Sequence, residues 1–155
     1  MKIKFVVYGD PMGKQRPKFS TNNGYIRTYT PKETETYESR VVNAFKSVIN
    51  PDVLDKPIFE PKQEVWATIT AYYKLQKEHY KKLGINQKGL DKLNGLINPT
   101  QKPDCDNIAK ICLDALNGIA YYDDSQVIGL CVMKRYSETP RVEITLESEL
   151  KWETF

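Results

Sequence analysis

The chain has 155 residues, a formal net charge of +3 and a mean hydropathy of −0.56. This length supports one hydrophobic core, so any binding surface and any chemistry must share a single domain. Because no apolar run is long enough to span a membrane and charges interrupt the apolar N-terminus, we expect a cytoplasmic protein with no membrane partner.

Few residues are suited to nucleophilic or zinc chemistry. The three cysteines, Cys105, Cys112 and Cys131, form no Cys-x-x-Cys pair, which favours reduced thiols over a disulfide framework or a zinc site. The single histidine, His79, lies in a lysine-rich stretch, so the chain lacks the parts of a Ser-His-Asp or Cys-His triad. Any catalysis would therefore depend on carboxylates.

The N-terminal part of the chain predicts a strand, a loop and a helix. Residues 2–8 alternate between two faces, as a half-buried strand does. Residues 9–30 are rich in Gly, Pro, Asn and Thr and predict a long irregular loop. A helix is predicted over 30–49 from apolar residues at helical spacing, with Thr30 as its cap and Glu33 reaching back to complete a capping box.

The rest of the chain predicts three more strands and a second main helix. Residues 64–73 alternate with apolar side chains on both faces, which favours a central strand. A helix is predicted from Asp104 to a stop at Asn117-Gly118. The runs 126–135 and 140–147 are predicted to pair as a hairpin. Four strands packed with two main helices predict a single α+β domain with one mixed sheet.

Basic residues concentrate in two places, the early loop and a middle stretch, 75–96, where short basic helices are predicted. The middle stretch would suit a surface that becomes ordered on DNA. For each cluster alone, a solvated face is as good an explanation. The candidate DNA contacts are Lys14, Arg16, Lys18, Lys77, Lys81 and Lys82, with further basic residues at Lys134-Arg135.

The most informative residues are closely spaced aspartates. Asp104 and Asp106 bracket one residue at the start of the second helix, and Asp124 follows that helix. If Asp104 is the cap, its non-helical backbone lets its carboxylate point where Asp106 points. The chain must double back through 118–122 for Asp124 to join them. Clustered carboxylates need a cation between them, and hard oxygen ligands favour Mg²⁺, with Mn²⁺ as an alternative.

Such a site would suit phosphodiester hydrolysis, because a divalent ion activates water and polarises a phosphate. Lys110 lies one helical turn beyond Asp106, where its ammonium could stabilise charge that develops on the phosphate. Simpler roles remain open at this point. Asp104 could be only a cap, Asp106 and Lys110 only a surface pair, and Asp123-Asp124 only turn residues.

A calcium-binding EF-hand loop is set aside. Ile108 and Ala109 stand where such a loop needs an oxygen ligand and a glycine.

Four segments together resemble the RusA family of Holliday junction resolvases: 9–17, 102–110, 114–118 and 122–127. The resemblance spans most of the chain and implies a RusA-like fold. It also implies a Mg²⁺-dependent homodimer, often encoded by prophages, that resolves four-way DNA junctions. Residues 75–96 look like a lineage-specific insertion into that pattern.

The resemblance also implies roles for individual residues. Its essential aspartates correspond to Asp104, Asp106 and Asp124, and Lys110 matches its catalytic lysine. Asp123 matches a recurrent acidic position and is included among the candidate metal ligands, while Asp114 could orient Lys110.

The homodimer also follows from a symmetry argument. Resolving a two-fold symmetric junction takes two symmetric nicks, hence two active sites related by a two-fold axis, and one small domain offers only one. Two other functions remain open: a nuclease for flaps, forks or other branched DNA, and a non-catalytic protein that binds branched DNA. Candidates for base stacking are Tyr8, Tyr72, Tyr80, Tyr121 and Tyr122, although a core or hairpin role is favoured for each.

Overall fold

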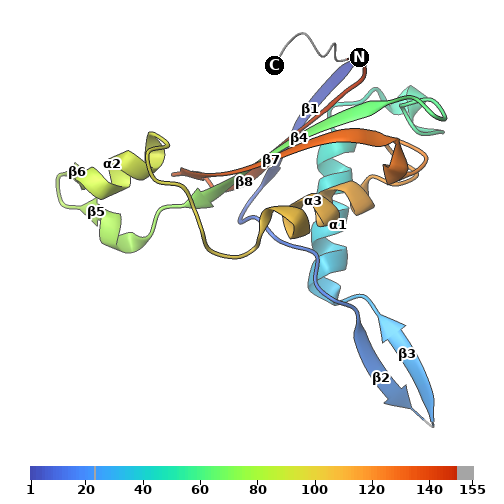
Figure 1. Ribbon diagram of the computed structural model, residues 1–155, viewed down its shortest axis with the longest axis horizontal. Coiled ribbons are helices and arrows are strands. Elements are labelled where there is room, and N and C mark those ends of the chain that lie inside the picture. Colours follow the sequence, from blue (N-terminus) through green and yellow to red (C-terminus); the bar gives the residue numbers. More distant parts are fainter. Residues whose placement is uncertain (23, 150–155) are drawn as a thin grey trace.

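A mixed sheet forms the centre of the molecule, in a computed structural model that describes residues 1–22 and 24–149 (Figure 1). Its strand order among these residues is β1–β8–β4–β7. Strand β8 runs antiparallel to β1 and β4, whereas β4 and β7 are parallel. The strands are β1 (Lys2–Tyr8), β4 (Val65–Lys74), β7 (Val127–Ser137) and β8 (Arg141–Glu147). The predicted α+β domain with one mixed sheet and a central β4 is confirmed.

Two helices, α1 (Lys32–Lys46) and α3 (Cys105–Ala115), pack on one face of the sheet (Figure 1). Their apolar stripes supply Val41 and Phe45 from α1 and Ile111 from α3, all fully buried. The Phe45 ring meets Phe5 of β1 edge to face, with 5.5 Å between the ring centroids. Burial of each such side chain contributes about 1.5–3 kcal/mol. None of the described helices is long and apolar enough to cross a membrane.

The predicted hairpin between the last two strands is wrong. Strand β4 lies between β7 and β8, and each of them pairs with β4 instead of with the other. Strands two places apart are separated by about 10 Å, and the link 138–140 spans that distance because each residue covers up to about 3.6 Å. Between its two partners, β4 buries Ile69 beside Val132 of β7 and Ile144 of β8.

The loop predicted over 9–30 contains a second, two-stranded sheet. Strands β2 (Lys18–Asn22) and β3 (Tyr25–Tyr29) form an antiparallel hairpin that projects from the body beyond the start of α1 (Figure 1). This polar, glycine-containing stretch has no alternating apolar pattern from which to predict it. The predicted cap is also wrong, since α1 begins after an extended Pro31 and no side-chain cap bond is found there among the described residues.

The segment 75–96 folds into a small lobe at the end of the sheet opposite the start of β7 (Figure 1). Its elements are η2 (Lys77–His79), β5 (Tyr80–Lys81), β6 (Gly84–Ile85) and α2 (Gln87–Leu93). Only one of the predicted short helices is a regular α-helix.

A buried polar network holds the lobe together. The Lys92 side chain, 6% exposed, places its Nζ atom 2.8 Å from Nε2 of His79 and 3.1 Å from Oε1 of Gln76. Because an ammonium can only donate, Nε2 of His79 accepts, and the neutral ring carries its proton on Nδ1. That proton is donated to Oδ1 of Asn86 over 3.2 Å. The Lys92 ammonium also lies 4.7 Å from the centroid of the Tyr136 ring on β7, which ties the lobe to the sheet.

We expect His79→Leu to loosen the lobe selectively. The change removes the buried acceptor of Lys92 and should cost about 2–4 kcal/mol of local stability. Amide hydrogen exchange across 76–93 should accelerate, while exchange in β4 and β8 stays protected. The control is Tyr80→Leu, a neighbouring and partly exposed ring. Equal exchange in both variants would show that the network does not hold the lobe.

Candidate active site

The start of α3 is held in place by residues of the sheet. The Tyr73 hydroxyl of β4 donates to the Pro103 carbonyl over 3.0 Å. The Tyr136 hydroxyl of β7 donates to Oε1 of Gln101 over 3.3 Å. The segment that leads into the helix is thus fixed to two neighbouring strands, and these bonds set the position of Asp104.

Asp104 is the residue that precedes the first turn of α3, and its backbone is extended (φ −76°, ψ 162°), as predicted. Its carboxylate makes no capping bond to the helix backbone within the described chain. Instead it accepts a hydrogen bond of 2.6 Å from the Asn107 side-chain amide. That bond, aided by the charges of Lys102 and Lys134, lowers the pKa of Asp104. The exposed carboxylate therefore stays ionised and keeps further lone pairs for a ligand.

The exposed face of α3 carries Asp106, Lys110 and Asp114 at intervals of four residues. In the residues that the structure covers, the side chains of Asp106 and Lys110 form no hydrogen bond or ion pair, either with each other or with a third group. The simple surface pair is therefore not formed. Asp114 lies 3.1 Å from Nζ of Lys14 and does not orient Lys110.

The segment 11–17 crosses α3 and brings Lys14 against it. The Lys14 backbone N–H donates to the Asn107 carbonyl over 3.0 Å. A Cβ atom on Gly13 would come within 3.0 Å of the Asn107 Cβ, so this approach requires glycine. The Lys14 ammonium bonds to Glu38 of α1 and to Asp114 of α3.

Partial burial acts to lower the pKa of Lys14, but its hydrogen bonds to the two carboxylates outweigh burial and raise it. Lys14, predicted as a DNA contact, thus connects the segment 11–17 to both helices.

Two adjoining clefts lie along this crossing. The first, of about 460 Å³, has Asp104 in its wall, and the second, of about 420 Å³, has Lys110. Both clefts share Lys14, Gln15 and Asn107. Asp104 and Lys110 therefore line two neighbouring clefts whose common wall contains the contact of Lys14 with Asn107.

After α3 the chain turns back against the end of the helix, but this turn does not return Asp124 to Asp104. The buried Tyr121 hydroxyl donates to the Leu113 carbonyl over 2.8 Å, which holds the turn against the last part of the helix. Burial is the main cause that raises the pKa of Tyr121, and the charges of Asp124 and Asp114 add to it. These two carboxylates therefore lie within electrostatic range of the same hydroxyl.

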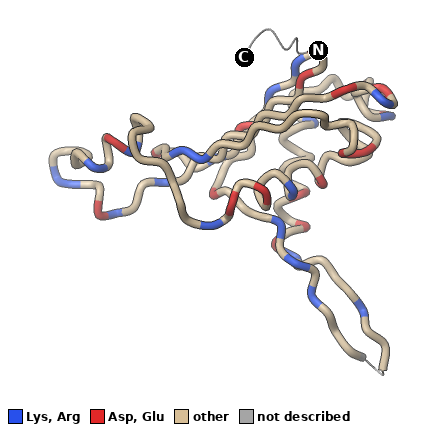
Figure 2. The backbone as a smooth tube through the Cα atoms, viewed as in Figure 1, with Lys and Arg blue, Asp and Glu red and all other residues tan. Residues whose placement is uncertain are grey.

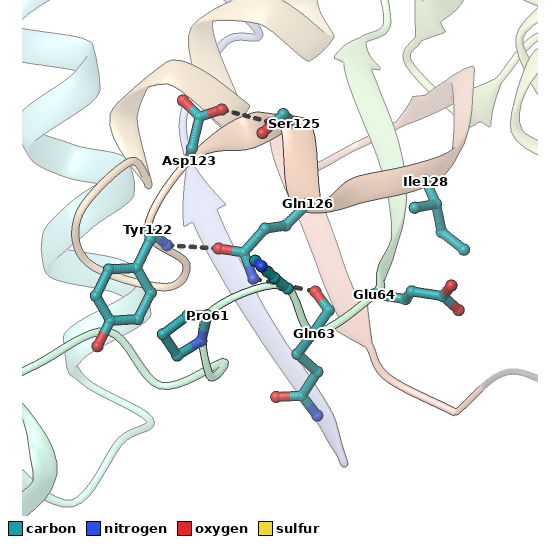
Figure 3. Close-up of a pocket in the computed structure, with 9 residues that line it drawn as sticks. Pro61, Gln63, Glu64, Tyr122, Asp123, Ser125, Gln126 and Ile128 are labelled. Atoms are coloured by element: carbon teal, nitrogen blue, oxygen red, sulfur yellow. Dashed lines mark hydrogen bonds between the residues drawn. The ribbon is translucent and has the colours of Figure 1, made fainter.

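Asp123 and Asp124 stand at the start of η3 (Asp124–Gln126), the single turn before β7. Asp123 accepts a 3.2 Å hydrogen bond from the Ser125 backbone N–H (Figure 3), and hydrogen bonding by the Ser125 side chain, followed by its backbone N–H, lowers the pKa of Asp123. Asp123 thus has a turn-capping role. The side chain of Asp124 makes no hydrogen bond or ion pair among the residues described.

Gln126 fixes this turn from below (Figure 3). Its buried side chain accepts from the Tyr122 backbone N–H over 2.9 Å. It also donates to the carbonyls of Glu60 and Gln63, over 2.9 and 3.0 Å. Gln126 was not predicted from the sequence, because its role depends on a segment more than 60 positions away. It lines a cavity of about 550 Å³ that Asp123 also borders.

The single chain does not bring the predicted metal ligands together. Asp104 begins α3, whereas Asp124 begins the turn beyond the other end of that helix (Figure 1). In residues 1–22 and 24–149 no group of three or more His, Cys, Asp or Glu side chains could hold a metal ion. Metal binding by Asp104, Asp106, Asp123 and Asp124 thus stays a prediction. The donor chemistry fits it, since the candidate ligands are all carboxylates and two of them are unbonded within the described ranges.

The other candidate DNA contacts are exposed and fall on two separate projections (Figure 2). Arg16 and Lys18 lead into the β2–β3 hairpin. Lys77, Lys81 and Lys82 lie on the lobe. The body between them carries the start of α3, so the acidic helix start is flanked by two basic arms.

An acidic helix start between two basic arms on an α+β domain is the arrangement of charges expected of a nuclease that acts on a phosphodiester backbone. Residues 8–147 match the family model described as Endodeoxyribonuclease RusA. The chain belongs to the RusA family, and the resemblance drawn from its motifs is confirmed. It is also 34% identical over 145 residues to the uncharacterized protein YqaN of Bacillus subtilis (strain 168), a match that covers 93% of this chain and 94% of that protein.

Proposed function

We propose that this chain is a divalent-metal-dependent endonuclease that resolves four-way DNA junctions by paired symmetric nicks. Membership of an endodeoxyribonuclease family supports the nuclease class. The observation that carries the proposal within the structure is the start of α3. There an exposed Asp104, ionised and held by Asn107, lines a cleft next to the one that Lys110 lines, and Lys110 has no ion partner in the described chain.

The proposed metal ligands are Asp104, Asp106 and Asp124, with Asp123 as a further candidate. A bound Mg²⁺ or Mn²⁺ ion would supply an activated water and polarise the scissile phosphate. Asn107 orients the Asp104 carboxylate and keeps it charged. Lys110, whose ammonium meets no competing carboxylate among the described residues, would neutralise charge that develops on the phosphate.

The working form is proposed to be a homodimer. Two nicks at symmetric positions need two equivalent sites, and a closed two-fold dimer supplies them. Asp124 is separated from Asp104 within one chain, and in the dimer the facing chain could bring the missing carboxylate.

A cleavage assay on matched substrates tests the function. We expect labelled four-way junctions to be nicked in Mg²⁺ or Mn²⁺ and to stay intact in EDTA. Three-way junctions and linear duplex of the same sequence should be nicked at least about tenfold more slowly at equal salt, since the two sites must fit a four-way geometry. Faster cutting of three-way DNA would favour a nuclease for flaps or forks. Tight binding with no metal-dependent product would make the chain a non-catalytic protein that binds branched DNA.

A further inference from the structure

The β2–β3 hairpin has two chemically different faces. In an antiparallel pair, opposite residues share a face and neighbours along a strand alternate. The register pairs Lys18 with Tyr29 and Ser20 with Arg27, so the first face carries Tyr25, Arg27, Tyr29 and Lys18. The second face carries Phe19 and Ile26 between threonines, because Phe19 pairs with Thr28 and Thr21 with Ile26.

The aromatic rings of the first face are open to solvent. Tyr25 is 76% and Tyr29 49% exposed, and every residue of β3 is exposed. A two-stranded hairpin with no core of its own is marginally stable in water. Exposed tyrosines on such an arm therefore indicate a surface that binds a partner.

The charge of the β2–β3 hairpin indicates which kind of partner this surface binds. Between residues 11 and 32 there are five basic residues and no Asp or Glu. In Figure 2 the charged positions of the hairpin are accordingly all Lys or Arg. Lys14 is paired with carboxylates of the body, whereas Lys18 and Arg27 form no ion pair among the described residues. A surface that alternates cations with tyrosine rings complements phosphates and bases together.

The tyrosine rings further restrict the kind of nucleic acid. In a closed duplex the faces of the bases are already stacked on each other, so rings can stack only on unpaired or splayed nucleotides. Branched DNA offers such nucleotides where its strands exchange. The hairpin follows directly from the segment 11–17, which lines both the cleft of Asp104 and the neighbouring cleft of Lys110. A branch point at these clefts would therefore lie beside the base of the arm.

We propose that the hairpin binds unpaired nucleotides of branched DNA, with Tyr25 and Tyr29 stacking on bases and Arg27 and Lys18 contacting the phosphates between them. The inference rests on the proposed function for its source of DNA, but it concerns recognition and not cleavage. Neither tyrosine was among the stacking candidates from sequence. Of those candidates, Tyr121 is buried, and the Arg141 guanidinium lies over the Tyr72 ring at 3.9 Å.

The test compares the two faces of the same hairpin in EDTA, where cleavage does not interfere. The probes are a labelled thymidine oligonucleotide, a duplex of equal length and a four-way junction. We expect Tyr25→Ser with Tyr29→Ser to weaken binding of the single strand by about tenfold or more, and duplex binding by less than about twofold. The matched control, Phe19→Ser with Ile26→Ser, should leave single-strand binding within about twofold. Arg27→Gln should weaken binding of all probes and reduce their salt dependence.

Other results would overturn the proposal or separate it from the proposed function. Equal losses in both face variants, or no loss in either, would overturn the proposal. The proposal would also be overturned if the double tyrosine substitution changed the sedimentation of the protein but not its DNA affinity. That face would then contact a second copy of the chain. If the wild type cuts no junction yet its single-strand binding depends on Tyr25 and Tyr29, the proposed function fails and this inference stands. If junctions are cut and the tyrosine variants bind like the wild type, the inference fails alone.

Discussion

Asp104→Asn should reduce nicking of four-way junctions by more than about a hundredfold and leave junction binding within about twofold. The amide keeps the shape of the side chain and removes the charge that a divalent ion requires. Because the carboxylate is exposed and does not cap α3, fold stability should not change. Nicking rate, gel-shift affinity and thermal unfolding, measured on one preparation, separate these effects.

Asp55→Asn is the matched control, since Asp55 is an exposed aspartate outside the candidate site. If both variants nick at the wild-type rate, Asp104 holds no catalytic ion. The arrangement of the ligands can be tested by mixing Asp104→Asn with Asp124→Asn protein. When each site takes Asp104 from one chain and Asp124 from the other, half of the sites in a mixed dimer are intact and junctions are nicked in one strand. When one chain supplies both ligands, a mixed dimer has no intact site and nicking does not return.

Gln126→Leu should raise the Mg²⁺ concentration needed for half-maximal nicking by about tenfold, a loss typical of groups that orient metal ligands. The leucine cannot accept from the Tyr122 N–H or donate to the carbonyls of Glu60 and Gln63. The turn that carries Asp124 then loses its link to the segment before β4. Leaving these buried groups unbonded should also cost about 2–4 kcal/mol of stability, measured by urea unfolding.

A purely structural role for Gln126 predicts a different pattern. Nicking would then fall only as folded protein is lost, and the Mg²⁺ requirement would stay at the wild-type value below the unfolding transition. The control variant Gln87→Leu removes an exposed glutamine on the lobe that bonds to Asp91 and should change neither property. Unchanged Mg²⁺ dependence in Gln126→Leu would show that this residue does not position the metal site.

The structure also changes the role expected for several charged residues. Lys14 is matched to two carboxylates and connects the segment 11–17 to α1 and α3. Lys110 is left without an ion partner in the described chain. Lys14 thus holds the segment 11–17 against the two helices, and Lys110 is the lysine that we propose to contact the phosphate. Sequence spacing alone cannot make that division, because it depends on which elements pack together.

Local patterns were sufficient for most elements of the body. Alternation predicted β1, β4 and β8, and helical spacing predicted α1 and α3, because these patterns record which side of an element is buried. The extended backbone of Asp104 before α3 was likewise predicted from a short motif. The family could be recognised for the same reason, since its motifs are short and contiguous in the chain.

Amino-acid order alone was enough to identify the family and the α+β class, and it supplied the aspartates and the lysine that we propose for nuclease chemistry. Tertiary contacts were needed to show that β7 pairs with β4, that β2 and β3 form a projecting arm, and that His79 holds a lobe through Lys92. They also place Asp124 beyond the opposite end of α3 from Asp104. Strand partners, buried polar contacts and distances between side chains depend on residues far apart in the chain, and local periodicity carries no information about which of them meet.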